Sequence, residues 1–287
     1  VLIIPPPEVQ IGASGFKIIP DSELVYGPVS AYFNVGEFVE QQGGYLSRHW
    51  EVVDEMETSG AAVLERVAQE NSINPRLLLA VLEYQSGWVT GGEPSEDQKK
   101  HPLATMEYWR VGLYHQLSWA ANALNRGYYL WRAEALGQIP LADGSAAPLD
   151  PTLNAGTAGV QYYLGQFYGA ADWQHAVSED GLFATYQSLF GYPFDLAIEP
   201  LIPEGLSQPT MVLPFNVGET WSFTGGPHGG WTDGSGWAAL DFAPPGEPQG
   251  CVVSPNWVTA VADGVVVRSG HGMVVLDLDG DGLEQTG

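Results

Sequence analysis

His228 and Asp241 are the two residues of this chain whose types and spacing most directly suggest metal chemistry. They stand at the two ends of HGGWTDGSGWAALD, a stretch rich in glycine and tryptophan. A neutral imidazole and a carboxylate are both ligands of catalytic Zn²⁺ sites, which keep one coordination position open for water. One interpretation is that the stretch forms a tight loop that aims both side chains at a metal ion. The alternative is a glycine-rich turn beside a strand, in which both residues are structural.

Two tryptophans, Trp231 and Trp237, flank the presumed metal loop among glycines that would leave their indoles partly exposed. Exposed indoles stack on sugar faces or wall off a peptide groove. We therefore place both residues in a substrate groove. His271 is the only histidine after Asp241, and we expect it to be an exposed residue at the start of a strand rather than a substitute ligand.

A second candidate metal site is the acidic sequence DLDGDG at residues 277–282. Asp277, Asp279 and Asp281, followed by Gly282, copy the first, third, fifth and sixth positions of a calcium loop. Three clustered carboxylates could bind Ca²⁺ weakly. The alternative is a tight hairpin turn between two valine-rich strands, since Asp-Gly pairs favour such turns.

The elements that would position these residues fall into four segments. Residues 1–44 carry prolines and glycines too often for long helices and are expected to form an extended arm across the next domain. Residues 45–197 show a helical apolar period. Residues 198–208 are a proline-rich linker, and residues 209–287 change to a period of two, which is typical of short antiparallel strands.

Several helices can be placed within residues 45–197. One is predicted to begin at the Thr58/Ser59 cap and the next to begin at Asn74-Pro75, where Asn caps and Pro takes the first helical position. Further helices are expected around Leu113–Leu124, over 158–169 and over 181–191, and a loop over 136–156. The spacing of three tryptophans indicates that they belong to the core, and these are Trp109, Trp119 and Trp131.

Strands are predicted in the last segment at TMVLPF, ETWSFTGG, WAALDFAP, WVTAVADGVVVRS and GMVVLDLDGDG. The sequence thus predicts an α+β protein of two domains, the first α-helical and the second mostly antiparallel β.

Composition limits the possible partners. The chain has 10 Lys and Arg against 34 Asp and Glu, a formal net charge of −24. Such a field repels nucleic acid and anionic membranes and suits an extracellular setting rich in divalent cations. No apolar run is long enough to span a membrane. The single cysteine, Cys251, has no internal disulfide partner, and we expect any partner to lie beyond Gly287.

Residues from about 210 to 287 resemble the lysostaphin and β-lytic (staphylolysin-like) zinc endopeptidases, which cut peptide cross-links in bacterial cell walls. The resemblance is carried by WSFTGGPHGGWTDGSGWAALDFAP and by VTAVADGVVVRSG. It implies that His228 and Asp241 are zinc ligands and that Gly264 is the turn of a hairpin under the groove. In that family a later His-x-His strand supplies the third ligand and a general-base histidine.

No His-x-His follows Asp241 in this sequence. Two ligands seldom hold zinc firmly, and no base is present to deprotonate its water. We therefore expect the natural chain to continue past Gly287, with the general-base histidine there, and the 287-residue form to be incomplete and inactive.

The helical segment has a second resemblance. INPRLLLAVLEYQSGW is similar to the first helices of lysozyme-like lytic transglycosylases, in which the corresponding helix ends in a catalytic Glu-Ser. Aligned on Ser86, that catalytic position is Gln85, which cannot donate a proton as a glutamic acid would. Glu83 lies two residues earlier and faces elsewhere on a helix. Glycan cleavage is therefore not expected, and either a degenerate glycan-binding groove or a purely structural helical scaffold remains.

Three functional hypotheses follow. The first is a secreted zinc metalloendopeptidase of the bacterial cell surface that acts on peptidoglycan cross-bridges or Gly-rich peptides. The second is a non-catalytic cell-wall-binding module. The third is a structural surface protein that assembles through its apolar N-terminal arm, VLIIPPP. We adopt the first for the complete protein.

Overall fold

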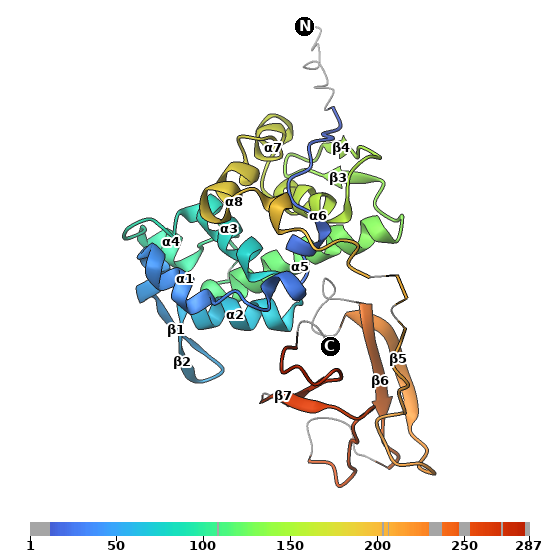
Figure 1. Cartoon of the computed structure of the whole chain (residues 1–287). Coiled ribbons are helices and arrows are strands. Elements are labelled where there is room, and N and C mark those ends of the chain that lie inside the picture. Colours follow the sequence, from blue (N-terminus) through green and yellow to red (C-terminus); the bar gives the residue numbers. More distant parts are fainter. Residues whose placement is uncertain are drawn as a thin grey trace, which may run out of the picture.

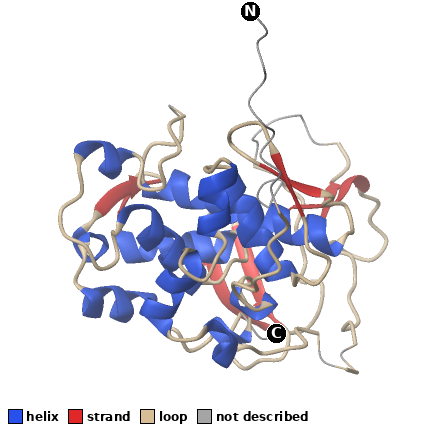
Figure 2. Cartoon of the chain, turned by 90° about the horizontal axis from the view of Figure 1, so that it is seen from above, coloured by secondary structure: helices blue, strands red, loops and turns tan. Residues whose placement is uncertain are grey.

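The computed structural model of the chain describes residues 12–107, 109–202, 204–205, 207–229, 237–246, 253–270 and 272–284. A helical region comes first along the chain, and a strand-rich region follows and lies below it in Figure 1. Figure 2 shows the helices gathered in one body and the strands as short pairs. The predicted α+β class, helical first and strand-rich second, is confirmed.

The helices are α1 (Val35–Gln42), α2 (Gly60–Glu70), α3 (Pro75–Ser86), α4 (Glu96–Lys100), α5 (Leu113–Arg132), α6 (Ala155–Gly165), α7 (Ala170–Ala176) and α8 (Leu182–Phe190). Short 3-10 helices are η1 (Asp21–Glu23), η2 (Pro28–Ser30), η3 (Tyr45–Arg48) and η4 (Pro193–Leu196). In the described part of the chain, the strands form four antiparallel pairs, β1 (Trp50–Val53) with β2 (Met56–Ser59), β3 (Gln138–Pro140) with β4 (Ala146–Pro148), β5 (Ser222–Gly229) with β6 (Trp237–Ala243), and β7 (Val265–Gly270) with β8 (Met273–Asp277).

The predicted helix starts at Ser59 and Asn74 are both present. The Ser59 side chain accepts a hydrogen bond from the Ala62 N–H at 3.3 Å, which satisfies a free donor of the first turn of α2. Asn74 does the same for Arg76 at 2.9 Å, and Pro75 occupies the first position of α3. Local capping chemistry therefore sets the corner between α2 and α3.

Helix α5 is the centre of the helical region. Its predicted face, Leu113, Leu117, Ala121 and Leu124, is fully buried. It packs closely against α6, because a Cβ added to Gly127 of α5 would lie 2.9 Å from the Cα of Gly159 in α6. Side chains larger than hydrogen at this crossing would push the two helices apart.

The predicted extended arm differs from the structure over its described part. Residues 12–44 contain η1, η2 and α1, and five of their apolar side chains are buried in the helical core: Ile18, Ile19, Leu24, Val35 and Val39. These residues provide core contacts, so residues 18–44 belong to the helical region. Residues 1–11 lie outside the described part of the chain.

Two other predictions need correction. Residues 136–156, predicted as a loop, contain the β3–β4 hairpin, which buries Ile139 and Ala147. Trp109, predicted as core, is 57% exposed. Trp119 and Trp131 are partly buried and pack against the core.

The strand-rich region follows the predicted segments in part. TMVLPF contains no assigned strand, although the Val212 N–H donates to the Val261 carbonyl at 2.8 Å and the Thr259 N–H to the Pro214 carbonyl at 3.0 Å. Gly264 is not the turn of a hairpin. It immediately precedes β7, where a Cβ would lie 2.4 Å from the Asp277 carbonyl, and the two strands of the β7–β8 pair are connected between Gly270 and Met273.

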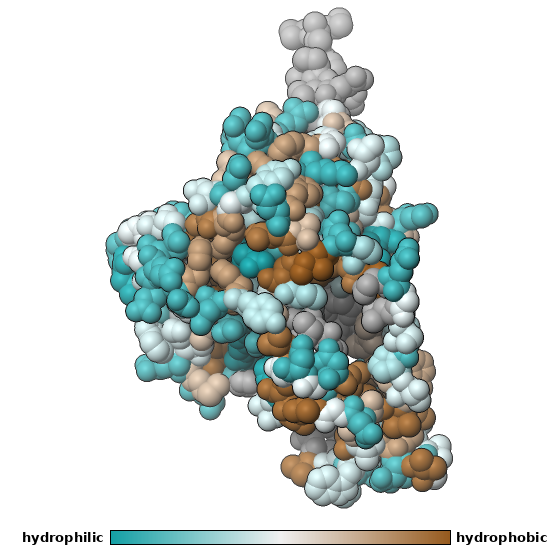
Figure 3. All heavy atoms as spheres, viewed as in Figure 1, coloured by the Kyte–Doolittle hydropathy of each residue, from teal (hydrophilic) through white to brown (hydrophobic). Residues whose placement is uncertain are grey.

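Burial is distributed unevenly between the two regions. Every buried hydrophobic residue among the described ones lies between Ile18 and Tyr186. In the strand-rich region, large apolar side chains such as Phe223 and Val274 are exposed, at 59% and 67%, and apolar surface is visible there in Figure 3. The helices of the described chain include none that is long and apolar enough to cross a membrane.

Candidate functional site

His228 and Asp241 lie on paired strands, β5 and β6. The backbone of His228 is opposite Ala239, and Asp241 is opposite Gly225. Diagonal positions of this kind in an antiparallel pair are about 7–8 Å apart between Cα atoms. The register therefore places the two residues as diagonal neighbours, although they are thirteen positions apart in the sequence and residues 230–236 between them lie outside the described residues.

An irregularity in β5 sets this register. Two residues lie between Gly225 and His228 on β5, whereas one lies between Ala239 and Asp241 on β6, so β5 carries one extra residue. Gly226 occupies this bulge with φ +119°, a conformation that glycine alone adopts easily, and a Cβ there would lie 2.5 Å from the Ala239 carbonyl. The glycine thus allows the bulge that sets the backbone position of His228.

The other residues predicted at this site are only partly described. Trp231 and His271 lie outside the described residues, as does Cys251. Trp237 begins β6, and its backbone is opposite Gly229. The substrate groove proposed for the two tryptophans therefore stays a prediction.

The three aspartates of the predicted calcium loop come together. One carboxylate oxygen from each of Asp277, Asp279 and Asp281 lies within 4.8 Å of the others. Asp277 is buried and its carboxylate accepts hydrogen bonds from the N–H groups of Asp279, Gly280 and Gly282, at 3.1, 2.9 and 2.8 Å. No strand follows the loop among the described residues up to 284.

Electrostatics keep the Asp277 carboxylate ionised. The backbone N–H groups of Gly282 and Gly280 lower its pKa below the ordinary value of an aspartate. An ionised carboxylate is the form that binds a cation. The loop thus offers three carboxylates, the oxygen ligands that Ca²⁺ prefers.

Glu83 and Gln85 contact different parts of the molecule. The Glu83 carboxylate accepts hydrogen bonds from the Val89 and Thr90 N–H groups at 2.9 and 3.0 Å, which fixes the loop after α3. The Gln85 oxygen accepts a hydrogen bond from the Tyr168 hydroxyl at 3.3 Å. Glu83 thus stabilises the loop after α3, and Gln85 contacts the segment after α6.

Comparison with known families gives one match. Residues 17–202 match the family model described as LasA, N-terminal domain. The chain belongs to this family. No curated protein and no solved structure matches the chain.

The LasA N-terminal domain of this chain includes α1 to α8 and all the buried hydrophobic residues of the described chain. It begins one residue before the buried Ile18, which agrees with the inclusion of residues 18–44 in the helical core. It ends at residue 202, inside the segment predicted as a linker, and before β5.

The family is consistent with the staphylolysin-like resemblance of residues 210–287, but the match does not extend to them, so that resemblance stays a prediction. The similarity of α3 to lytic transglycosylases also stays a prediction.

Proposed function

We propose that this LasA-family chain is part of a secreted zinc endopeptidase that cleaves peptide cross-bridges of bacterial cell walls. His228 and Asp241 are two of its metal ligands. The observation that carries the proposal is their placement as diagonal neighbours on β5 and β6, with a glycine bulge that sets the register. The LasA N-terminal domain supports a peptidase context, and the acidic composition suits an extracellular site.

The residues present suit zinc in chemical type. A neutral imidazole and a carboxylate are common zinc ligands, and a bound zinc ion polarises a scissile carbonyl and activates water. The imidazole of His228 and the carboxylate of Asp241 would hold the ion between adjacent strands. Trp231 and Trp237, on the connection between these strands and at its end, would border the peptide groove.

Zinc content and peptidase activity test this proposal together. The natural polypeptide is dialysed against trace zinc, its metal content is measured by mass spectrometry, and hydrolysis of a pentaglycine peptide is followed. We expect about one zinc per chain, with loss of both metal and hydrolysis in His228→Ala and Asp241→Asn. The matched control is His175→Ala, because His175 is an exposed histidine of α7.

Retention of full zinc content in both ligand variants would show that these residues do not bind the metal. If zinc is absent and the protein still binds cell-wall fragments after chelation, the non-catalytic wall-binding module becomes the better account.

We also propose that Asp277, Asp279 and Asp281 bind Ca²⁺ as a stabilising ion. The support is the convergence of their three carboxylates within 4.8 Å and the buried, ionised state of Asp277. A ligand that binds only the folded protein stabilises it by about 2.7 kcal/mol at one hundred times its Kd. Calcium should therefore raise the melting temperature of the strand-rich region.

Thermal unfolding with added CaCl₂ or MgCl₂ checks the calcium proposal. We expect Ca²⁺ to raise the Tm in the wild type but not in Asp279→Ala, and Mg²⁺ to have less effect because it dehydrates reluctantly. Asp263→Asn is the control, since Asp263 is an exposed aspartate outside the loop. An equal Tm with and without Ca²⁺ in the wild type would rule the ion out.

A further inference from the structure

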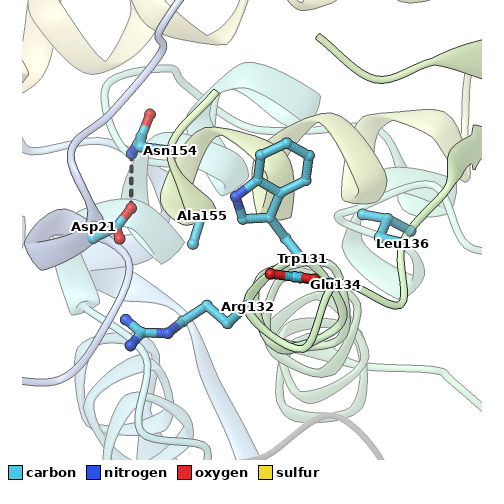
Figure 4. Close-up of a pocket in the computed structure, with 7 residues that line it drawn as sticks. All are labelled: Asp21, Trp131, Arg132, Glu134, Leu136, Asn154 and Ala155. Carbon is cyan, nitrogen blue, oxygen red and sulfur yellow. Dashed lines mark hydrogen bonds between the residues drawn. The ribbon is translucent and has the colours of Figure 1, made fainter. Parts of the chain in front are cut away.

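A cavity of about 570 Å³ lies where the end of α5 meets the start of α6 (Figure 4). A neighbouring cavity of about 390 Å³ shares Asp21 and Arg132 with it and continues toward residues 199–202. We call the first cavity with this extension the α5–α6 trough. The first cavity is lined by Asp21, Trp131, Arg132, Glu134, Leu136, Asn154 and Ala155.

Hydrogen bonds fix the position of Asp21, which forms an acidic wall of the trough. Asp21 Oδ1 accepts hydrogen bonds from Asn154 Nδ2 at 2.8 Å and from the Gly156 N–H at 2.7 Å, at the start of α6. Asn154 also donates to the Ile19 carbonyl at 2.8 Å. The second carboxylate oxygen of Asp21 has no hydrogen-bond partner among the described residues, so it remains available to a ligand.

The other walls of the trough carry polar side chains that make few hydrogen bonds within the described protein. Of the guanidinium donors of Arg132, only Nη1 has a protein acceptor in the described chain, the Tyr128 hydroxyl at 3.2 Å. Glu134 makes no side-chain hydrogen bond or ion pair with any described residue. In Figure 4 the indole of Trp131 stands at the centre of the view, between Arg132 and Leu136. The trough thus presents donors, acceptors and an aromatic wall.

Glu134 also adopts a strained backbone conformation. Helix α5 ends in a left-handed turn, in which the Glu134 N–H bonds to the Trp131 carbonyl and the Ala135 N–H to the Leu130 carbonyl. The turn position with positive φ is normally glycine, but here it is Glu134, with φ 55°. A bulky residue in this position reduces stability, which suggests that the carboxylate serves a purpose other than folding.

The charges of the trough select against an anion. The carboxylates of Asp21, Glu134 and Glu199 line it together with the guanidinium of Arg132, which leaves the lining net negative. A neutral ring with vicinal hydroxyl groups satisfies donors and acceptors together, and its C–H face can pack on an indole. The volume lies within the range of about 300–1,000 Å³ that is usual for ligand sites.

We propose that the α5–α6 trough binds a neutral saccharide, with one pyranose ring packed on Trp131 and its hydroxyl groups bonded to Asp21, Arg132 and Glu134. Such a ring could come from the amino-sugar chain of a cell wall or from another neutral polysaccharide. The site does not rest on the proposed zinc chemistry, because its lining residues come from η1, from α5 to α6, and from residues 199–202, and none from β5 or β6.

Titration calorimetry on the whole chain tests the proposal, with N,N′,N″-triacetylchitotriose and cellotriose as neutral probes and lysine amide and sulfate as ionic ones. We expect a neutral trisaccharide to bind and to shift the indole ¹⁵N–¹H signal of Trp131. Preference for chitotriose would assign the site to amino sugars, and equal binding of both would assign it to neutral glycans in general. EDTA should not change the affinity.

Two variants separate ligand binding from folding. Trp131→Ala should weaken binding about tenfold, whereas Trp109→Ala, which removes an exposed tryptophan elsewhere, should leave it unchanged. Because Trp131 also packs against the core, Glu134→Gly is the decisive variant. Relief of the positive-φ strain should raise the Tm by a few degrees, while loss of the carboxylate should weaken saccharide binding.

Three results would overturn the proposal. The first is no heat of binding and no shift of the Trp131 signal with either trisaccharide at roughly 10 mM. The second is a saccharide affinity that is unchanged in both Trp131→Ala and Glu134→Gly. The third is binding of lysine amide or sulfate without binding of either trisaccharide. None of them bears on zinc content, so failure here is distinct from failure of the peptidase proposal.

Discussion

Arg76 and Glu23 form a buried ion pair at the start of α3. The guanidinium Nε and Nη2 donate to the Glu23 carboxylate at 3.1 and 3.0 Å, and Nη2 also donates to the Val29 carbonyl at 2.6 Å. Glu23 is fully buried and Arg76 is 8% exposed. The Tyr186 hydroxyl donates to the same carboxylate, and burial raises the pKa of Tyr186. The network joins η1, α3 and α8.

Arg76→Met should therefore destabilise the protein strongly. It leaves the Glu23 charge buried and uncompensated, a change that typically costs about 3–5 kcal/mol. The double variant Glu23→Gln/Arg76→Met should lose less, because no buried charge remains. Urea unfolding measures both. Lys99→Met is the control, since Lys99 pairs with exposed Glu93 and Glu96 and should cost less than about 1 kcal/mol. Equal losses for Arg76→Met and Lys99→Met would contradict this account.

Single residues differ in how far the sequence alone reveals their roles. Ser59 and Asn74 could be predicted as caps, because a cap depends on the residue and the few that follow it. Glu134 could not, since its strained turn ends α5 without the usual glycine signal. Trp131 has a helical spacing that fits a core position, and only the contact of α5 with α6 shows that it also borders a cavity.

The β1–β2 hairpin positions a cap for α5. Its Glu51 carboxylate accepts hydrogen bonds from the Leu113 and Tyr114 N–H groups at 2.8 and 2.7 Å, at the first turn of the 20-residue helix. Burial alone would raise the pKa of Glu51, but hydrogen bonds from His49, Tyr114 and Leu113 outweigh it and lower the pKa. The ionised carboxylate also suits the positive end of the helix dipole.

The cap makes stability depend on pH in a defined direction. Because the folded pKa of Glu51 is lowered, its contribution is present above the unfolded value of about 4.3 and is lost as the pH falls through the folded pKa. Glu51→Gln should cost about 1 kcal/mol at pH 7, and the difference from wild type should shrink at about pH 3. Urea unfolding at both pH values checks this.

Glu57→Gln is the matched control for Glu51→Gln, because Glu57 is an exposed glutamate of β2 in the same hairpin. It should have little effect at either pH. A Glu51→Gln penalty that is the same at both pH values would show that the carboxylate charge does not contribute.

Elements differed in how well they could be predicted. The α2–α3 corner combines caps with a regular apolar period, so the local sequence determines it. The β1–β2 hairpin turns at Asp54 and Glu55, both at positive φ, without the Asn-Gly or Asp-Gly pair that usually marks such turns. The β3–β4 hairpin has strands of only three residues and depends on burial against the helices. The β5–β6 pair was predicted because its strands are longer and alternate.

At the scale of the whole molecule, the hydrophobic core belongs to one region. The described buried hydrophobic residues all lie between Ile18 and Tyr186, within the LasA N-terminal domain. The strand-rich region meets this domain at a cavity of about 280 Å³, lined by Arg66 and Glu70 from α2 and by Arg268 and Met273 from β7 and β8. The strand-rich region contributes no residue to the buried hydrophobic set of the described chain.

A chain shortened to residues 12–202 should therefore fold by itself. It keeps every buried hydrophobic residue described above, so its helical circular dichroism and cooperative unfolding should persist. Its Tm should lie within about 4 °C of the whole chain, the shift expected for roughly 1 kcal/mol in a domain of this size. In the absence of Ca²⁺, residues 207–287 alone should show no cooperative transition and should bind a hydrophobic dye, because large apolar side chains such as Phe223 and Leu240 are exposed. Failure of the 12–202 fragment to fold would mean that the strand-rich region stabilises the helical core through contacts other than apolar burial.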